Sequence, residues 1–434
     1  MKTLFLIAIR NLVANMRRSL LLGGAIATVT LILVVLSSVS NGMQVNMLKI
    51  ATTLSSGHVN VGGFYKLTSG DASPMLSDYP KLRAHVEARK EELGITHVTV
   101  RGRGWGKIIS DQASQQGALV GIDIIDEPRF AEIVETVQGD INRLKEDNAI
   151  MLFEKQAERL EVKLGDNITV SAPTYRGVNN TVDAQVVAIA KDMGMMSAWA
   201  IFMSNSGLRR LYDMKPEHAG ALHIFLADPE KADSVAASLR RSLGAEGHRV
   251  MDSAGQPFWQ KFQSVSREDW TGQKLDISTW TDEMQFMKYV LSTFSLLTVI
   301  FVAILLGLIV MGVVNTLYMA IRERTREIGT LRAIGMDRSY VLLMFTYEAF
   351  VLSVIATLTG AILGAALCAG LNAAEIGVNK GFQMFLMSDK LQLLFDVNTA
   401  LMAIVTIAVV TTLSSLLPSW RAAKRPPITA IQHV

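Results

Sequence analysis

Hydrophobic residues gather in four long apolar runs, and a long polar segment separates the first run from the second. The runs cover residues 19–42, 289–321, 340–374 and 397–420. Each can cross a bilayer, because a spanning helix needs about 20 apolar residues. The polar segment covers residues 43–288. The pattern predicts four transmembrane helices, with a soluble domain inserted between the first two.

Basic residues orient these helices. Lysine and arginine are abundant in residues 1–18, in the 322–339 segment and in the 421–434 tail, whereas the 375–396 connection is not basic. Because basic loops favour the cytoplasmic side, we expect both termini inside and the insert outside. Residues 1–18 also predict an amphipathic helix in the cytoplasmic interface, or simply a basic anchor. A cleaved signal peptide is a further alternative, although the apolar core is longer than is usual.

The insert alternates β-rich runs with helical segments, which predicts an α+β domain of one or two subdomains. Expected strands are 58–61, 97–100, 118–122, 167–172, 184–190 and 221–226, and expected helices are 80–92 and 229–243. The basic, glycine-rich stretch 101–107 lacks the spacing of a phosphate loop and predicts a strand edge or turn.

Composition adds little chemistry to this picture. Half of the residues are hydrophobic, the mean hydropathy is +0.30 and the net charge is +3, so a nucleic-acid partner is not expected. The single cysteine and the scattered histidines form no metal-binding pattern, and no catalytic motif is present. We expect a non-enzymatic chain with no metal and no cofactor of its own.

Apolar residues also recur at alternating four- and three-residue steps on both flanks of the insert, as in a coiled-coil seam. We expect them to form a helical stalk that joins the outer domain to the membrane and transmits movement, or ordinary packing of helix ends. The stalk residues are Met43, Met47, Ile50, Leu54, Ile277, Trp280, Met284, Met287 and Leu291.

Four stretches resemble those of FtsX-like permeases. Residues 322–335 keep the pattern R-x-R-E-I-G-x-L-R-A-x-G, and residues 417–431 resemble the family's P-x-W-R-A-A ending. Residues 154–166 are similar to a motif of the MacB-type periplasmic core domain, and residues 56–61 to the LolC/LolE lipoprotein-releasing permeases. This resemblance covers the order of all parts of the chain.

The resemblance implies a permease subunit of a MacB/LolCDE-type ABC transporter in the bacterial inner membrane. Its outer domain would have Porter and Sabre parts in the periplasm, and a second permease copy, the same chain or a sister subunit, would join it. MacB carries its own ATPase, but here 18 residues precede the first span and no phosphate loop is present. We therefore expect a separate ATPase chain to bind ATP and Mg.

The basic cytoplasmic segment 322–339 is the expected ATPase-coupling site. Its arginines can pair with carboxylates of a partner while Ile328 and Leu331 bury apolar area, or the arginines simply satisfy the positive-inside rule. The coupling residues are Arg322, Arg324, Arg326, Glu327, Ile328, Gly329, Leu331, Arg332 and Gly335.

Three further positions carry expectations about packing and charge. Gly360 and Gly364 are spaced for close helix–helix approach. Glu348 lies near the start of the third span, where a carboxylate is usually functional or paired, or extends to the interface. The predicted hairpin tip at 173–181 carries Tyr175 and Arg176. These two are possible contacts for a periplasmic chaperone if the tip corresponds to the hook of lipoprotein-releasing permeases, or they belong to a plain turn.

These expectations lead to one main hypothesis, which is lipoprotein release from the inner membrane. One alternative is an efflux permease for a peptide, toxin or small amphiphile, with a membrane-fusion protein as partner. The other is a non-transporting signal relay, which the length of the insert disfavours.

Overall fold

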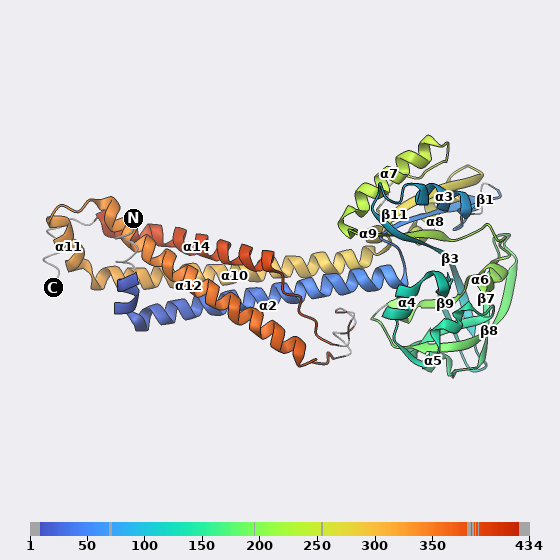
Figure 1. Ribbon diagram of the computed structural model, residues 1–434, viewed down its shortest axis with the longest axis horizontal. Helices are drawn as coiled ribbons and strands as arrows, with labels where there is room; N and C mark the ends of the chain where they lie inside the picture. The colour runs from blue at the N-terminus through green and yellow to red at the C-terminus, as the bar shows by residue number, and fades with distance from the viewer. Residues whose placement is uncertain are drawn as a thin grey trace. The chain divides into compact units, whose positions relative to one another are not determined.

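The computed structural model describes residues 9–68, 72–194, 196–252, 255–379, 383, 386, 388 and 390–424. The chain forms two compact units. The helical unit comprises Met1–Gln44, Leu291–Val378 and Lys390–Val434. The sheet unit comprises Val45–Val290 and Asn379–Asp389. Figure 1 shows the long helices of the first and the strands of the second.

Among these described residues, four helices are long and apolar enough to cross a membrane: α2 (Met16–Leu54), α10 (Gln285–Glu323), α12 (Arg338–Ala373) and α14 (Val397–Lys424). They confirm the four predicted spans. α2 and α10 extend past the apolar runs into the flanks that carry the seam residues. Residues 9–14 are helical, Asn15 is a turn and residues 16–18 already belong to α2. Residues 1–8 of the predicted 1–18 helix and residues 425–434 of the predicted tail lie outside the described residues.

Close approach between α2 and α12 organises the helical unit. A side chain added at Gly360 would collide with the backbone oxygen of Ala27, and one at Gly364 would lie 3.0 Å from Val34. The two glycines therefore let the helix backbones approach closely, as small residues do in membrane helices. Ile26, Leu33, Ile309, Phe345 and Ile407 belong to one buried cluster that connects all four spans.

The sheet unit is built on one mixed sheet whose main strand order is β11-β1-β10-β3-β4-β9-β6-β8-β5. The strands are β1 (Val59–Lys66), β2 (Ala72–Ser73), β3 (Ile95–Ile109), β4 (Ser114–Ile122), β5 (Thr136–Gly139), β6 (Ala149–Phe153), β7 (Asn167–Pro173), β8 (Asn179–Ala190), β9 (Ala200–Ser204), β10 (Ala221–Leu226) and β11 (Gly272–Thr279). The pairs β4–β9 and β6–β8 are parallel, while β1, β3, β10 and β11 pair antiparallel.

Two hydrophobic cores share this sheet. The first packs β1, β3, β10 and β11 against α3 (Tyr79–Ala88) and α7 (Ala232–Ala245). The second packs β4, β6, β7, β8 and β9 with α5 (Glu154–Leu160) and α6 (Asn205–Tyr212). The 15-residue strand β3 pairs with β10 along its first half and with β4 and β7 along its second half. The sheet unit thus has two subdomains joined by β3.

All six expected strands and both expected helices are present, with other bounds; the strand expected at 97–100 extends over Ile95–Ile109. The sequence pattern did not reveal β2, β5, β6, β9 or β11. The expected seam also starts too early: Ile277 lies in β11, and Trp280 begins the short helix α9 (Trp280–Glu283). Met284 lies at the break between α9 and α10. Pairing of β11 with β1 holds residues 272–279 extended, so the helical seam of this flank begins at Met284.

Candidate functional site

The candidate coupling site is the short helix α11 (Thr325–Ala333), which connects α10 to α12. α10 ends at Glu323, and Arg324 has non-helical dihedral angles. At the far end Gly335 has φ of +107°, a conformation that glycine adopts without steric cost. The N–H groups of Gly335 and Met336 bond back to Arg332 and Leu331, at 3.1 Å each, which closes the end of the helix.

One face of α11 packs into the helical unit and the other is exposed. Ile328 is 4% exposed and belongs to the unit's own core, and Gly329 is also buried. Arg322, Arg326 and Glu327 are exposed. The expectation that Ile328 contacts a partner therefore does not fit its position.

The exposed apolar residues of this region are Leu331, at 36%, and Ile334, at 80%. Sequence reasoning missed Ile334, although it lies only two residues after the motif's last arginine. Arg332 is half-buried and donates to the backbone oxygen of Ala423 in α14, at 2.8 Å. Arg332 therefore holds α11 against α14, and it is less available than Arg322 or Arg326 for an external carboxylate.

A charged cluster lies behind the coupling helix. Glu348 of α12 is 4% exposed and pairs with Arg18, at 3.6 Å, and with Arg324, at 3.5 Å. Arg18 also reaches Glu323, at 3.3 Å. The cluster ties the start of α2, the end of α10 and the first turns of α12 together. It places Glu348 among arginines, and the sequence pattern did not indicate that Arg18 and Arg324 would be its partners.

In the sheet unit, two arginines of β3 contact the ends of two helices, α2 and α9. Arg101 is 1% exposed. It bonds Glu127 through two nitrogens, one at 2.7 Å, and donates to the backbone oxygen of Thr53 at 2.7 Å. Thr53 lies in the last turn of α2. A guanidinium there satisfies a free carbonyl and opposes the negative end of the helix dipole.

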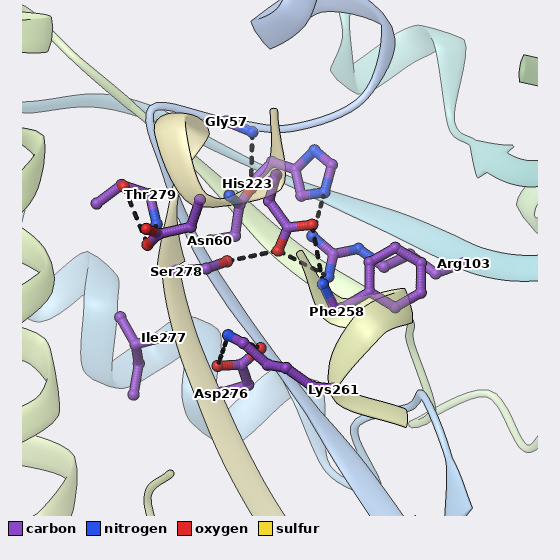
Figure 2. Close-up of polar contacts among 12 residues, drawn as sticks. Gly57, Asn60, Arg103, His223, Phe258, Lys261, Asp276, Ile277, Ser278 and Thr279 are labelled. Carbon is purple, nitrogen blue, oxygen red and sulfur yellow. Dashed lines mark hydrogen bonds and ion pairs between the residues drawn. The ribbon is translucent and has the colours of Figure 1, made fainter. Parts of the chain in front are cut away.

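Arg103 lies two residues further, on the same face of β3. It lies 3.8 Å from Glu283 at the end of α9 and 3.3 Å from His223 Nε2. The Phe258 ring covers its guanidinium at 4.8 Å, and Ser278 donates to Glu283 at 2.6 Å. Figure 2 shows these side chains converging at the end of β11, immediately before α9.

The environment of this cluster favours fixed charges over titration. His223 is 1% exposed, and burial, with Arg101 and Arg103 nearby, holds its pKa well below the usual value. A neutral imidazole can accept a hydrogen bond from Arg103. The two β3 arginines thus attach the end of α2 and the end of α9, which directly precedes α10, to one strand. Sequence reasoning rejected this stretch as a phosphate loop and predicted a strand edge or turn, whereas it lies inside β3.

The remaining stalk residues are mostly buried. Met43, Met47, Ile50 and Leu54 of α2 are at most 5% exposed, and Met284 and Met287 are 6% and 2% exposed. Trp280 and Leu291 are half-buried. Burial of both seams fits packed helices, and it does not distinguish a force-transmitting stalk from ordinary packing.

The predicted hairpin tip joins β7 to β8 and lies against α6. The Tyr175 N–H bonds the Tyr212 oxygen at 3.4 Å, and Asn180 bonds the Arg210 and Leu211 oxygens at 3.0 Å. Arg176 is exposed and stacks on the Tyr175 ring. The tip is short and held by α6, which favours a plain turn over a long protruding hook.

Comparison with known proteins places the chain in context. Residues 299–427 match the family model described as FtsX-like permease C-terminal. The lipoprotein-releasing system transmembrane protein LolC of Haemophilus influenzae is 22% identical over 348 residues, which is 78% of this chain and 75% of LolC. The macrolide export ATP-binding/permease protein MacB of Nitrobacter winogradskyi is 35% identical over 120 residues, which is 28% of this chain and 16% of MacB.

Among solved structures, the periplasmic region of MacB from Actinobacillus actinomycetemcomitans is 11% identical, with a TM-score of 0.31. The match covers 53% of this chain and 92% of that region.

Proposed function

We propose that the chain, which is similar to permeases of the FtsX, LolC and MacB type, is an ABC transporter permease that couples ATP hydrolysis on a separate chain to lipoprotein release. The ATPase would bind ATP and Mg in the cytoplasm of a bacterium. The sheet unit would lie in the periplasm, and a second permease copy would complete the complex in the inner membrane.

The extent of the LolC match carries the choice of substrate. It spans 78% of this chain and 75% of LolC, so it includes much of the polar insert as well as the spans. The MacB match reaches 35% identity but covers only 28% of this chain. It supports export of an amphiphile as the second candidate. Because substrate selection is a property of the outer domain in this proposal, the longer match favours lipoproteins.

The ATPase contact would be the exposed face of the coupling region. Arg322 and Arg326 offer fixed positive charge, and Leu331 and Ile334 offer an apolar contact next to it. Arginine beside exposed apolar residues is a common composition of interface hot spots. The charged cluster around Glu348 would pass displacement of this helix to α2, α10 and α12.

Docking is tested by the double variant Arg322→Glu/Arg326→Glu, co-expressed with the ABC ATPase that co-purifies with the wild-type chain. We expect the ATPase no longer to co-purify, because glutamates at positions 322 and 326 would repel the carboxylates of the ATPase that the two arginines are proposed to contact. Lys145→Glu/Lys163→Glu, two exposed changes in the sheet unit, is the matched control. Unchanged recovery of the ATPase with the first variant would refute docking at this face.

Substrate is tested by depleting the chain in its native cells and following pulse-labelled lipoproteins. We expect them to remain in the inner membrane. Normal lipoprotein sorting together with accumulation of an exported amphiphile would instead select the second candidate.

A further inference from the structure

The sheet unit contains a cavity of about 380 Å³ beside the last turns of α2. Residues of α2, of β3 and β10, and of the 127–133 segment line it. Its volume falls within the range of about 300–1,000 Å³ that is usual for small-molecule sites. The cavity does not include any residue of the coupling helix α11.

One wall of the cavity is apolar. Val45 and Leu48 of α2 lie there together with Phe130, Ile133 and Phe225. Val45 is 50% exposed, whereas Phe130 and Phe225 of the same wall are 1% and 7% exposed. An apolar wall with exposed side chains favours a ligand that carries a hydrocarbon portion.

The other part of the lining is cationic. Lys49, Arg101 and Arg129 face the single carboxylate of Glu127 among the lining residues. Arg101 is 1% exposed, and its NH1 atom has no hydrogen-bond partner. A buried guanidinium nitrogen without an acceptor is costly. An anion in the cavity would supply the missing acceptor.

The two histidines of the lining do not offset this charge. Burial, Arg129 and His97 lower the pKa of His58 to about 4. Burial, Arg129 and Lys90 also lower the pKa of His97. Both imidazoles are therefore neutral near pH 7, and the lining stays net positive without becoming strongly so.

We propose that this cavity binds an acyl-chain amphiphile with one anionic head group. Its chain would lie along Leu48, Phe130 and Ile133, and its head group would contact Arg101 and Arg129. Because Arg101 also bonds the Thr53 oxygen at 2.7 Å, an occupant would change how the end of α2 is held. The site concerns ligand binding and does not depend on which substrate is transported.

The test uses the full chain in phosphatidylcholine nanodiscs and titrates it with dansyl-undecanoic acid, whose fluorescence rises on entering an apolar site. We expect saturable binding. Lys49→Glu/Arg129→Glu should weaken it by about tenfold or more, because both changes place negative charge at the head group. Both positions are exposed, so folding should persist, which the thermal midpoint checks. Lys145→Glu/Lys163→Glu is the control and should bind normally.

Two further ligands make the result decisive. The methyl ester of the same probe lacks the charge and should bind much more weakly. Inorganic phosphate alone should not displace the acid. Equal affinity of both double variants, equal binding of the ester, or displacement by phosphate would each overturn the proposal. None of these outcomes bears on lipoprotein sorting, which tests the transport function separately.

Discussion

At the scale of single residues, the sheet unit depends on buried polar groups with fixed partners. Lys261 and Asp276 form an ion pair at 2.7 Å with side chains only 3% and 4% exposed. Arg101 with Glu127 is buried to the same degree. Such pairs add little net stability relative to apolar residues, but the loss of one partner leaves an uncompensated charge. They therefore restrict which arrangement of β11, α8 (Phe258–Arg267) and β3 is tolerated.

The first prediction follows for the Lys261–Asp276 pair. Lys261→Met should lower the free energy of unfolding by about 3–5 kcal/mol, because Asp276 remains buried and unpaired. The double variant Lys261→Met/Asp276→Leu should recover most of this loss. Lys274→Met, in the more exposed pair with Glu268, should cost less than about 1 kcal/mol. Urea unfolding of the full chain in detergent, followed by tryptophan fluorescence, measures all three. A double variant no more stable than Lys261→Met would contradict the account.

The second prediction concerns pH. Burial, Arg129 and His97 depress the pKa of His58 to about 4, from 6.5, so the unfolded chain binds a proton at this residue more readily than the folded one. The contribution of His58 to the free energy of unfolding should be fully present above about pH 6.5 and should be lost as the pH drops towards 4. His58 accepts from the Leu226 N–H at 2.9 Å, and His58→Asn retains an acceptor.

In His58→Asn the thermal midpoint should fall less with decreasing pH than in the wild type. In His248→Asn, a change at an exposed histidine, it should fall as in the wild type. The thermal midpoint of the full chain from pH 7.5 to 5 provides the measurement. Identical pH profiles for wild type and His58→Asn would rule out His58 as a source.

At the scale of elements, helices and strands with a clear hydrophobic pattern could be predicted from the sequence. Elements and contacts that depend on residues far apart in the chain could not. The four spans were evident because about 20 consecutive apolar residues have no common soluble alternative. β6 and β9 were missed because each is a run of five buried residues, AIMLF and AIFMS, without the alternation that marks a half-exposed strand.

The functional contacts show the same limit. The stalk methionines of α2 could be predicted from their spacing, since spacing is local. The partners of Arg101 and Arg103 could not, because Thr53 and Glu283 lie on other elements far along the chain. Ile277 was misassigned because its neighbours match a helical period, while pairing with β1 decides its conformation.

The third prediction tests the contact between α2 and α12. Gly360→Ala places a methyl group against the Ala27 backbone oxygen, which cannot move without separating the helices. It should destabilise the chain by about 1–3 kcal/mol. Gly370→Ala, in the same helix with no atom within 4 Å of the added carbon, should be neutral or stabilise by up to about 1 kcal/mol through helix propensity. Thermal unfolding in detergent compares them. Equal midpoints would show that α2 and α12 do not approach closely.

At the scale of the whole molecule, the proposed transport requires movement to pass between the coupling helix and the sheet. Each end of this path has a charged cluster: Arg18, Arg324 and Glu348 behind α11, and Arg101 and Arg103 on β3. The α2 and α10 helices have residues in both clusters or next to them. Because a helix is stiff along its axis, the attachments at its ends decide whether displacement is transmitted.

The fourth prediction separates transmission from ATPase binding. Glu283→Gln removes the charge that faces Arg103 at 3.8 Å, with side chains 8% and 4% exposed, while an amide can still accept from Ser278. The attachment of α9, which directly precedes α10, to β3 should weaken, and the free energy of unfolding should fall by up to about 3–5 kcal/mol. ATPase co-purification and hydrolysis should persist, because α11 is unchanged. Lipoprotein release should fall by about tenfold or more, because the Arg103–Glu283 contact that would transmit displacement is weakened. Glu230→Gln, an exposed change, should leave both unchanged. Full release by Glu283→Gln at normal expression would show that Arg103 only packs the sheet, and loss of ATPase binding would show that the defect is global.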